Sequence, residues 1–467
     1  MKQAESDKQE RLSILVDLEH PLIVLSSSLD WDELLARVET IRKSKVKSAA
    51  GRPQCLRALV ATVLVKAYMN ETYRRDSDLI RHFAPARYLA GLTESDWSPA
   101  KSTIWDFHAM LGEDGEKAIN EYVVMVAARN HFMDPHHLVA DTTAQEAAIP
   151  YPNEMGLMSS FLKRVERASA TVGGVFKSFA STAAGTFQKA RIAFREYRLF
   201  AKTKTKEAKD ALVAEMADHV EQVQDQLRVT LTAALEQKPT LVKYQNVAFR
   251  CLLRLHRIVT TLLPQIRSWL KTGRVAKNKI ISLTIPETYA IVRGKVGKKV
   301  EFGLNWGIAR LRGGYLLATL AKDSEELVDT KFAVRAVSDH IRLFGKAPKS
   351  FAYDRAADSR ETIAKLKSLG VKQIGIARKG KTAWLVRGKA KTKLITERAR
   401  VEGGIGTIKS QAYGFNKPAA RSRKMMGVCG QAAVMGFNVS RFVQDVARRE
   451  AAALMAATRR RGRTKTA

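Results

Sequence analysis

The sequence predicts an α/β protein in which a mixed α/β region is interrupted by a large helical insertion and preceded by an α-helical N-terminal domain. Three observations support this class. Residues 1–135 repeat apolar side chains with the roughly 3.6-residue period of helices, and residues 155–276 show the same pattern over about 120 positions. From about residue 280, short apolar runs bounded by turn signals indicate strands that alternate with helices.

The N-terminal domain, residues 1–135, shows its first clear helix after the breaker Gly51-Arg52-Pro53, with an apolar face from Leu56 to Tyr68. A later helix begins near Ser102-Thr103. Four arginines of this domain could dock on DNA, although an ordinary helical domain would also carry such side chains in solvent. They are Arg74, Arg75, Arg81 and Arg87.

The mixed α/β region comprises residues 136–154 and 277–445. Its first strand is the apolar run Leu138-Val139-Ala140, and residues 147–149 are expected to pair beside it. Further strands are predicted at 289–292, 300–304, 305–311, 315–320, 351–353 and 371–377, with helices at 328–344 and 358–369, the second ending at Gly370. This order resembles a ribonuclease-H-like α/β core that is interrupted by a helical domain.

The helical insertion, residues 155–276, carries a basic stripe. Arg191, Arg195, Arg198 and Lys202 follow one another at intervals of four, three and four positions, so they share one helical face. A solvated face is one interpretation. Contact with DNA phosphates is the other, and it is favoured because residues 161–210 hold twelve Lys or Arg against four acids.

The whole chain is strongly basic. Its 467 residues include 80 Lys or Arg and 46 Asp or Glu, which gives a formal charge of +34. This charge is several times the magnitude of about 2–8 that is usual for a small domain, and it indicates a polyanionic partner. DNA, RNA or an anionic membrane would satisfy it. Residues 378–400 hold nine Lys or Arg and one acid, Glu397. The basic C-terminal end, 446–467, is expected to finish in a disordered tail, 451–467, that grips phosphates.

Cysteine usage and hydropathy indicate a cytoplasmic protein. Cys55, Cys251 and Cys429 are far apart in the sequence, so neither a zinc site nor a disulfide framework is expected. The first residues lack the apolar segment of a secretory signal. No apolar run reaches the roughly 18 residues of a membrane span. We therefore expect a reducing compartment and no membrane partner.

Three carboxylates stand in places that suit metal-assisted phosphodiester chemistry. Asp141 and Asp354 each close an apolar run and are expected at strand ends, and Glu402 follows on a later helix. Asp is common at strand ends as a turn former, so neither aspartate is informative alone. Together with Glu402 they could converge on a pair of divalent metal ions. Mg²⁺ is the expected ion, with Mn²⁺ as a substitute, because carboxylate oxygens suit hard cations.

The helix of Glu402 also carries two cations. Arg398 lies four residues before Glu402 and Lys409 seven residues after it, so all three share one face. Both cations could hold phosphates beside the metals, whereas a simple surface ion pair of Arg398 with Glu402 is the alternative. Gly403-Gly404 follows on the same helix. Each glycine destabilises a helix by roughly 1 kcal/mol relative to alanine, and close approach of another backbone or of nucleic acid would explain that cost. His136 and His137 are interpreted as strand-edge residues rather than ligands.

Together, these blocks resemble those of bacterial insertion-sequence DDE transposases. The similar segments are Asp141-Thr142-Thr143, the run from Tyr353-Asp354-Arg355 to Asp358-Ser359, and Arg398-x3-Glu402-x6-Lys409 with Tyr413-Gly414. They look like the group with a Tyr-Arg-Glu-Lys signature, although the tyrosine position is occupied by Ile395 and Ala356-Ala357 replaces a frequent Gly-Tyr.

The resemblance implies a metal-dependent DNA transposase of the bacterial nucleoid. Such an enzyme cleaves and joins phosphodiesters at the terminal inverted repeats of an insertion sequence and in target DNA. It is expected to act as a homodimer on paired ends. Two alternatives stay open: a catalytically degenerate DNA-binding protein, and a ribonuclease-H-like nuclease that cuts without strand transfer.

Overall fold

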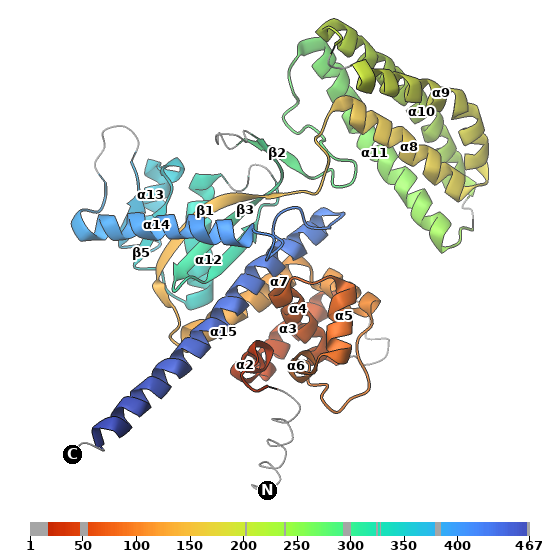
Figure 1. Cartoon of the computed structure of the whole chain (residues 1–467). Coiled ribbons are helices and arrows are strands. Elements are labelled where there is room, and N and C mark those ends of the chain that lie inside the picture. Colours follow the sequence, from red (N-terminus) through yellow and green to blue (C-terminus); the bar gives the residue numbers. More distant parts are fainter. Residues whose placement is uncertain are drawn as a thin grey trace. The chain divides into compact units, whose positions relative to one another are not determined.

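The computed structural model of the chain has the α/β class that the sequence predicts (Figure 1). It describes residues 17–46, 55–200, 203–237, 240–292, 300–323, 326, 328–378 and 384–464, so the predicted breaker Gly51-Arg52-Pro53 lies outside the described residues. The chain divides into two compact units, one formed by Ile149–Gly303 and the other by Met1–Ala148 with Leu304–Ala467. The predicted limits of the insertion, 155 and 276, both lie within Ile149–Gly303.

A six-stranded sheet has the order β2-β3-β1-β5-β6, and β4 pairs with β3. β5 is parallel to β1 and to β6, whereas β3 is antiparallel to β4 and to β2. The β3–β4 turn needs glycine, because Gly313 has a φ of 109° and a Cβ there would lie 2.7 Å from the Phe132 carbonyl oxygen. The strands are β1 (Asp134–Glu146), β2 (Tyr289–Val292), β3 (Val300–Arg312), β4 (Leu316–Leu320), β5 (Ser350–Tyr353) and β6 (Gln373–Ile376).

Three helices accompany the strands that follow β4. The helix α12 (Asp329–Phe344) connects β4 to β5, α13 (Arg360–Ser368) connects β5 to β6, and α14 (Gly388–Ile408) comes after β6. α14 packs against β1, β5 and β6 (Figure 1). Gly375 permits this approach, because a Cβ at that position would lie 2.8 Å from the Leu394 side chain. The close fit fixes the position of α14 relative to the ends of β1 and β5.

The N-terminal helices share one hydrophobic core with this sheet. The long helix α15 (Arg423–Thr464) packs against α4, α7 and β4. At its closest point, Gly436 meets the carbonyl of Ala67, where a side chain would clash. The N-terminal helices are α2 (Pro21–Ser28), α3 (Trp31–Lys45), α4 (Leu56–Met69), α5 (Tyr73–His82), α6 (Ala84–Leu89) and α7 (Lys101–Arg129).

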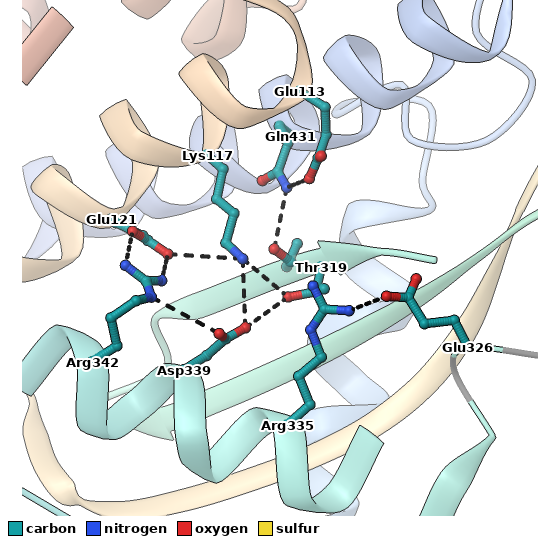
Figure 2. Close-up of polar contacts among 10 residues, drawn as sticks. Glu113, Lys117, Glu121, Thr319, Glu326, Arg335, Asp339, Arg342 and Gln431 are labelled. Carbon is teal, nitrogen blue, oxygen red and sulfur yellow. Dashed lines mark hydrogen bonds and ion pairs between the residues drawn. The ribbon is translucent and has the colours of Figure 1, made fainter. Parts of the chain in front are cut away.

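A polar network joins α7 to the sheet and to α12 (Figure 2). Lys117 Nζ lies 3.3 Å from Thr319 Oγ1 and 3.5 Å from Asp339 Oδ2. One helical turn further along α7, the carboxylate of Glu121 accepts hydrogen bonds from both terminal guanidinium nitrogens of Arg342. Because a bidentate pair restrains direction as well as distance, the network fixes α7 in register with α12.

The unit Ile149–Gly303 consists mainly of a four-helix bundle. Its core contains one apolar face from each helix, and Ile280 and Leu283 close it. Among the described residues, no helix of either unit combines the length and the apolar character that a membrane span requires. The bundle helices are α8 (Glu154–Val172), α9 (Val175–Phe200), α10 (Lys206–Gln237) and α11 (Lys243–Thr272).

The structure corrects three predictions about secondary structure. Residues 147–149 form no strand. The two strands predicted at 300–304 and 305–311 are one continuous strand, β3, because no turn residue separates them. The C-terminal segment 451–467 was expected to be disordered, but α15 continues to Thr464. The alanines and arginines of this segment are strong helix formers, which explains the continuation.

Candidate active site

The pairing of β1 with β5 brings the first two predicted carboxylates level with each other. The register places His137 opposite Ser350, Leu138 opposite Phe351 and Val139 opposite Ala352. Continued by two residues, it places Asp141 opposite Asp354. Neighbouring strands lie about 4.7–4.9 Å apart, and level residues of parallel strands point to the same face. The two aspartates therefore start from one face of the sheet, side by side.

Asp141 was expected at a strand end. It lies instead within β1, which continues to Glu146. β5, by contrast, ends at Tyr353, and Asp354 begins the short 3₁₀ helix η1 (Arg355–Ala357) by accepting a hydrogen bond from the Ala356 N–H. The last residue of β5, Tyr353, is level with Ala140, so β5 ends just before the level of Asp141. Only Asp354 follows a strand end, as predicted.

Glu402 on α14 reaches this edge through Arg398. The Arg398 Nη2 atom lies 3.3 Å from Glu402 Oε1 and 3.5 Å from Asp354 Oδ2. One guanidinium thus links the second and third predicted carboxylates. The side chain of Glu402 is 57% exposed and that of Asp354 is 39% exposed, so both can be reached by a ligand from solvent.

A fourth carboxylate, Asp329, fixes the strands next to the site. It lies in the first turn of α12, where its Oδ1 atom accepts hydrogen bonds of 3.0 Å from Thr142 Oγ1 and from the Tyr353 hydroxyl. Burial raises the pKa of Tyr353 well above its ordinary value, and the charges of Asp329 and Asp141 add to that shift. The phenol therefore stays protonated and donates. Asp329 does not stand out in the sequence, because an acid in the first turn of a helix is ordinary.

Asp358, which belongs to one of the segments that resemble transposases, has a structural partner. Its Oδ1 atom lies 2.7 Å from Arg378 Nε, and its side chain is 8% exposed. Ser359 next to it caps α13 by accepting the N–H of Thr362. These contacts hold the segment between β5 and α13 in place, directly after Asp354.

The donor set of the site suits a hard divalent cation. Asp141, Asp354 and Glu402 offer only carboxylate oxygens, the ligands that Mg²⁺ and Mn²⁺ prefer. In the described part of the chain, no three His, Cys, Asp or Glu side chains are close enough to hold one ion. The Arg398 guanidinium lies between two of the three carboxylates instead. Its ion pairs are solvent-exposed and contribute only about 0–1 kcal/mol each, so a cation could displace it at small cost.

The remaining residues of the predicted helix are on or next to α14. Lys409 is the C-cap residue and donates its backbone N–H to Ile405, so the helical spacing from Glu402 holds. Ile395, at the tyrosine position of the signature, is 46% exposed. Of the two glycines, a Cβ on Gly404 would lie 3.4 Å from Leu316, an ordinary contact, and a Cβ on Gly403 would meet nothing within 4 Å. Packing within the chain therefore requires glycine at neither position.

The predicted basic stripe lies on α9, in the other unit. Arg191, Arg195 and Arg198 are exposed, but Arg191 is bound to Glu166 with a distance of 2.9 Å. Lys202 lies outside the described residues. In the N-terminal helices, Arg74, Arg75 and Arg81 are exposed.

Arg87 is not available for DNA, contrary to expectation. Its guanidinium donates to backbone carbonyls, among them those of Arg81 and Leu92. The two histidines before Asp141 are strand residues, as interpreted: both lie in β1, and His137 bonds Ser350 Oγ at 2.6 Å.

No protein-family model, curated protein or solved structure matches the chain.

Proposed function

We propose that this protein is a DNA transposase of the bacterial nucleoid that cleaves and joins phosphodiesters with Asp141, Asp354 and Glu402. One observation carries the proposal. Carboxylates far apart in the sequence lie along one edge of the sheet, since the β1–β5 register sets Asp141 level with Asp354 and Arg398 contacts both Asp354 and Glu402. The formal charge of +34 supports a long polyanion such as double-stranded DNA as substrate.

The strand order supports a ribonuclease-H-like core for this enzyme. An antiparallel pair, β3 and β4, lies beside β1, and the parallel strands β5 and β6 follow on the other side. The helices α12 and α13 connect successive strands, and the bundle α8–α11 is inserted between β1 and β2. This is the arrangement expected for such a core interrupted by a helical insertion.

Asp141, Asp354 and Glu402 would hold divalent cations, Mg²⁺ or Mn²⁺. When bound, such ions activate the attacking oxygen and stabilise the leaving oxygen of a phosphodiester displacement. Arg398 exchanges its carboxylate partners for the phosphate, so that its charge offsets the charge that builds up on the phosphoryl oxygens. In the first displacement, a water oxygen bonds to phosphorus as the bond to the 3′-oxygen breaks, which leaves a free 3′-hydroxyl.

Strand joining repeats the same displacement with a different nucleophile. The free 3′-hydroxyl attacks a phosphodiester of the target, a new P–O bond forms, and the target's own 3′-oxygen leaves. The chain contributes no covalent intermediate, so its residues bind, orient and neutralise. Because two ends must meet one target, we propose a homodimer on paired terminal repeats.

The test is cleavage of DNA that carries the sequences flanking the coding region. Wild type should nick it at the element ends with Mg²⁺ or Mn²⁺. The variants Asp141→Asn, Asp354→Asn and Glu402→Gln should each lose cleavage and keep DNA binding. Glu361→Gln, an exposed carboxylate on α13, is the matched control and should cleave normally. Full cleavage in excess chelator, or by all three variants, would exclude this chemistry.

A non-catalytic DNA-binding protein is the second candidate, and one contact favours it. Arg398 supplies a positive charge between Asp354 and Glu402 from within the chain. Wild-type protein that binds flanking DNA but never cuts it, with either metal, would select this candidate. Cutting without joining would instead indicate a nuclease.

A further inference from the structure

A basic site lies on the side of α14 that faces away from Glu402. It is an open cleft of about 570 Å³. Lys393 is nine residues before Glu402, which is two and a half helical turns, so the two side chains leave the helix in opposite directions. The cleft is therefore separate from the carboxylates. Its lining consists of Arg312, Lys389, Thr392, Lys393, Thr396, Glu397 and Arg400.

The acid of this cleft is already neutralised. Glu397, the one acid among residues 378–400, is 6% exposed. Its two carboxylate oxygens accept hydrogen bonds from Arg310 at 2.8 Å and from Arg400 at 2.7 Å. Glu397 thus has two arginine partners within the chain. One carboxylate cannot balance two guanidinium groups, so the three side chains together carry a net positive charge.

The two lysines at the mouth of the cleft are not balanced either. Lys389 and Lys393 are exposed, and neither forms an ion pair with a described acidic residue. The charge of Lys393 also acts on a neighbouring group: burial lowers the pKa of His137, and the charges of Arg312 and Lys393 add to that shift, against Asp134 and Glu397. Exposed, uncompensated cations next to a cleft are the arrangement that binds anions.

The distance between the outermost cations of the cleft indicates which kind of anion it binds. Lys389 and Arg400 are eleven residues apart on one helix, which corresponds to about 16 Å of rise. A single phosphate group is far too small to touch both. One DNA strand, by contrast, carries a phosphate every 3.4 Å or so of helix axis. The hydroxyl of Thr392 and the first-turn N–H groups of α14, where no side chain caps the helix, provide neutral donors for the same oxygens.

We propose that this cleft binds the sugar–phosphate backbone of DNA, at several successive phosphates, on the opposite side of α14 from the carboxylates. The inference rests on the proposed function only in taking DNA as the partner. It adds a second contact region, which holds the DNA in register while the carboxylate edge acts elsewhere on it. An anionic membrane is the competing polyanion, but a membrane surface cannot follow a concave cleft.

The test compares two double variants that remove equal charge. Lys389→Ala with Lys393→Ala alters the cleft, and Lys365→Ala with Lys367→Ala removes two exposed lysines from α13 in the same unit. Binding to a 30-base-pair duplex is measured by fluorescence anisotropy from 50 to 200 mM salt. Each lost phosphate contact lowers the slope of log K against log salt by about 0.9.

The cleft variant should lose about 1.8 from that slope, and the α13 control should lose little. Over the fourfold rise in salt, wild-type binding should therefore weaken about twelvefold more than binding by the cleft variant. Lys389→Arg with Lys393→Arg should keep the wild-type slope. Thermal melts of all variants should coincide, since the exposed lysines make no contact that folding needs.

Three results would overturn the proposal or separate it from the proposed function. Equal slopes for the cleft and control variants would mean that the cleft is only solvated. If the cleft variant loses binding to phosphatidylserine vesicles but binds DNA like wild type, the cleft is a membrane contact. If the cleft variant shows the expected change in salt slope but the wild-type protein never cleaves DNA, the transposase proposal is refuted and the proposed DNA contact at the cleft is retained.

Discussion

The two sides of α14 hold their glutamates in opposite ways. Glu397 is buried and bound by two arginines, whereas Glu402, five residues later, is 57% exposed and shares one arginine with Asp354. Burying an ion pair makes each partner dependent on the other, while an exposed pair can be exchanged at little cost. The difference teaches which carboxylate serves the fold and which one is available for a ligand.

The largest expected effect concerns the exposed side. Arg398→Ala and Lys409→Ala should each slow single-turnover cleavage by on the order of 10²–10³, because an oriented charge beside the transition state is lost. Their thermal melts should match wild type. Arg387→Ala, an exposed arginine before α14, is the control and should cleave normally. If both variants melt and cleave like wild type, the assignment of this helix to the site is wrong.

The next effect concerns the buried side. Glu397→Ala should lower the free energy of unfolding by about 3 kcal/mol, because it leaves Arg310 without its partner in a largely buried position. Glu402→Ala should lower it by only about 0–1 kcal/mol. Urea unfolding followed by tryptophan fluorescence measures both. Equal losses for the two variants would remove the contrast between the sides of α14.

A third carboxylate, Asp76, extends the comparison to a buried acid without an arginine. Its side chain is fully buried, and neither carboxylate oxygen accepts a hydrogen bond from the described residues. Burial raises its pKa well above the ordinary value, against the opposing charge of Lys66. The folded protein therefore keeps the proton to a higher pH than the unfolded chain does.

The sign of the resulting pH dependence follows from that shift. Below about pH 4 both states are protonated, and above it the unfolded state ionises first, so this group lowers stability as pH rises. Asp76→Asn should raise the melting temperature at pH 8 more than at pH 4. A constant difference across this range would show that Asp76 is ionised in the fold.

The smallest effect is expected on α9. Arg195→Ala with Arg198→Ala should reduce the salt slope of duplex binding by at most about 1.8. Arg191→Ala should change it less, because that side chain is already engaged by Glu166. Arg250→Ala with Arg257→Ala on α11 removes the same charge from another exposed face of the bundle. Identical slopes for the two double variants would mean that the α9 stripe is merely solvated.

Much of the fold followed from local patterns. The strands near 289–292, 315–320 and 351–353 and the helix near 328–344 occur where turn residues and apolar periods indicate them. The lengths of β1 and β3 could not be read in this way, because pairing with neighbours extends a strand beyond its apolar run. Similarly, only the packed structure shows that the N-terminal helices share a core with the sheet.

The candidate site was predictable in its residues but not in its contacts. Asp141, Asp354 and Glu402 stood out by their position after apolar runs and by their spacing from Arg398 and Lys409. That Arg398 bridges two of them depends on the packing of α14 on the sheet, which no sequence interval encodes. Asp329 and the pairing of Glu397 with Arg310 likewise arise from tertiary contact alone.

The β1–β5 register has a consequence for how this chain can diverge over generations. The register of the two strands sets Asp141 level with Asp354, and the helical bundle inserted between them in sequence takes no part in that pairing. Since each doubling of a connecting loop costs only about 0.6 kcal/mol, lineages can gain, lose or exchange whole helices there. A one-residue deletion inside β1 would instead turn Asp141 to the opposite face. Length is free to drift in the insertion, whereas the length of β1 before Asp141 is fixed by the pairing with β5.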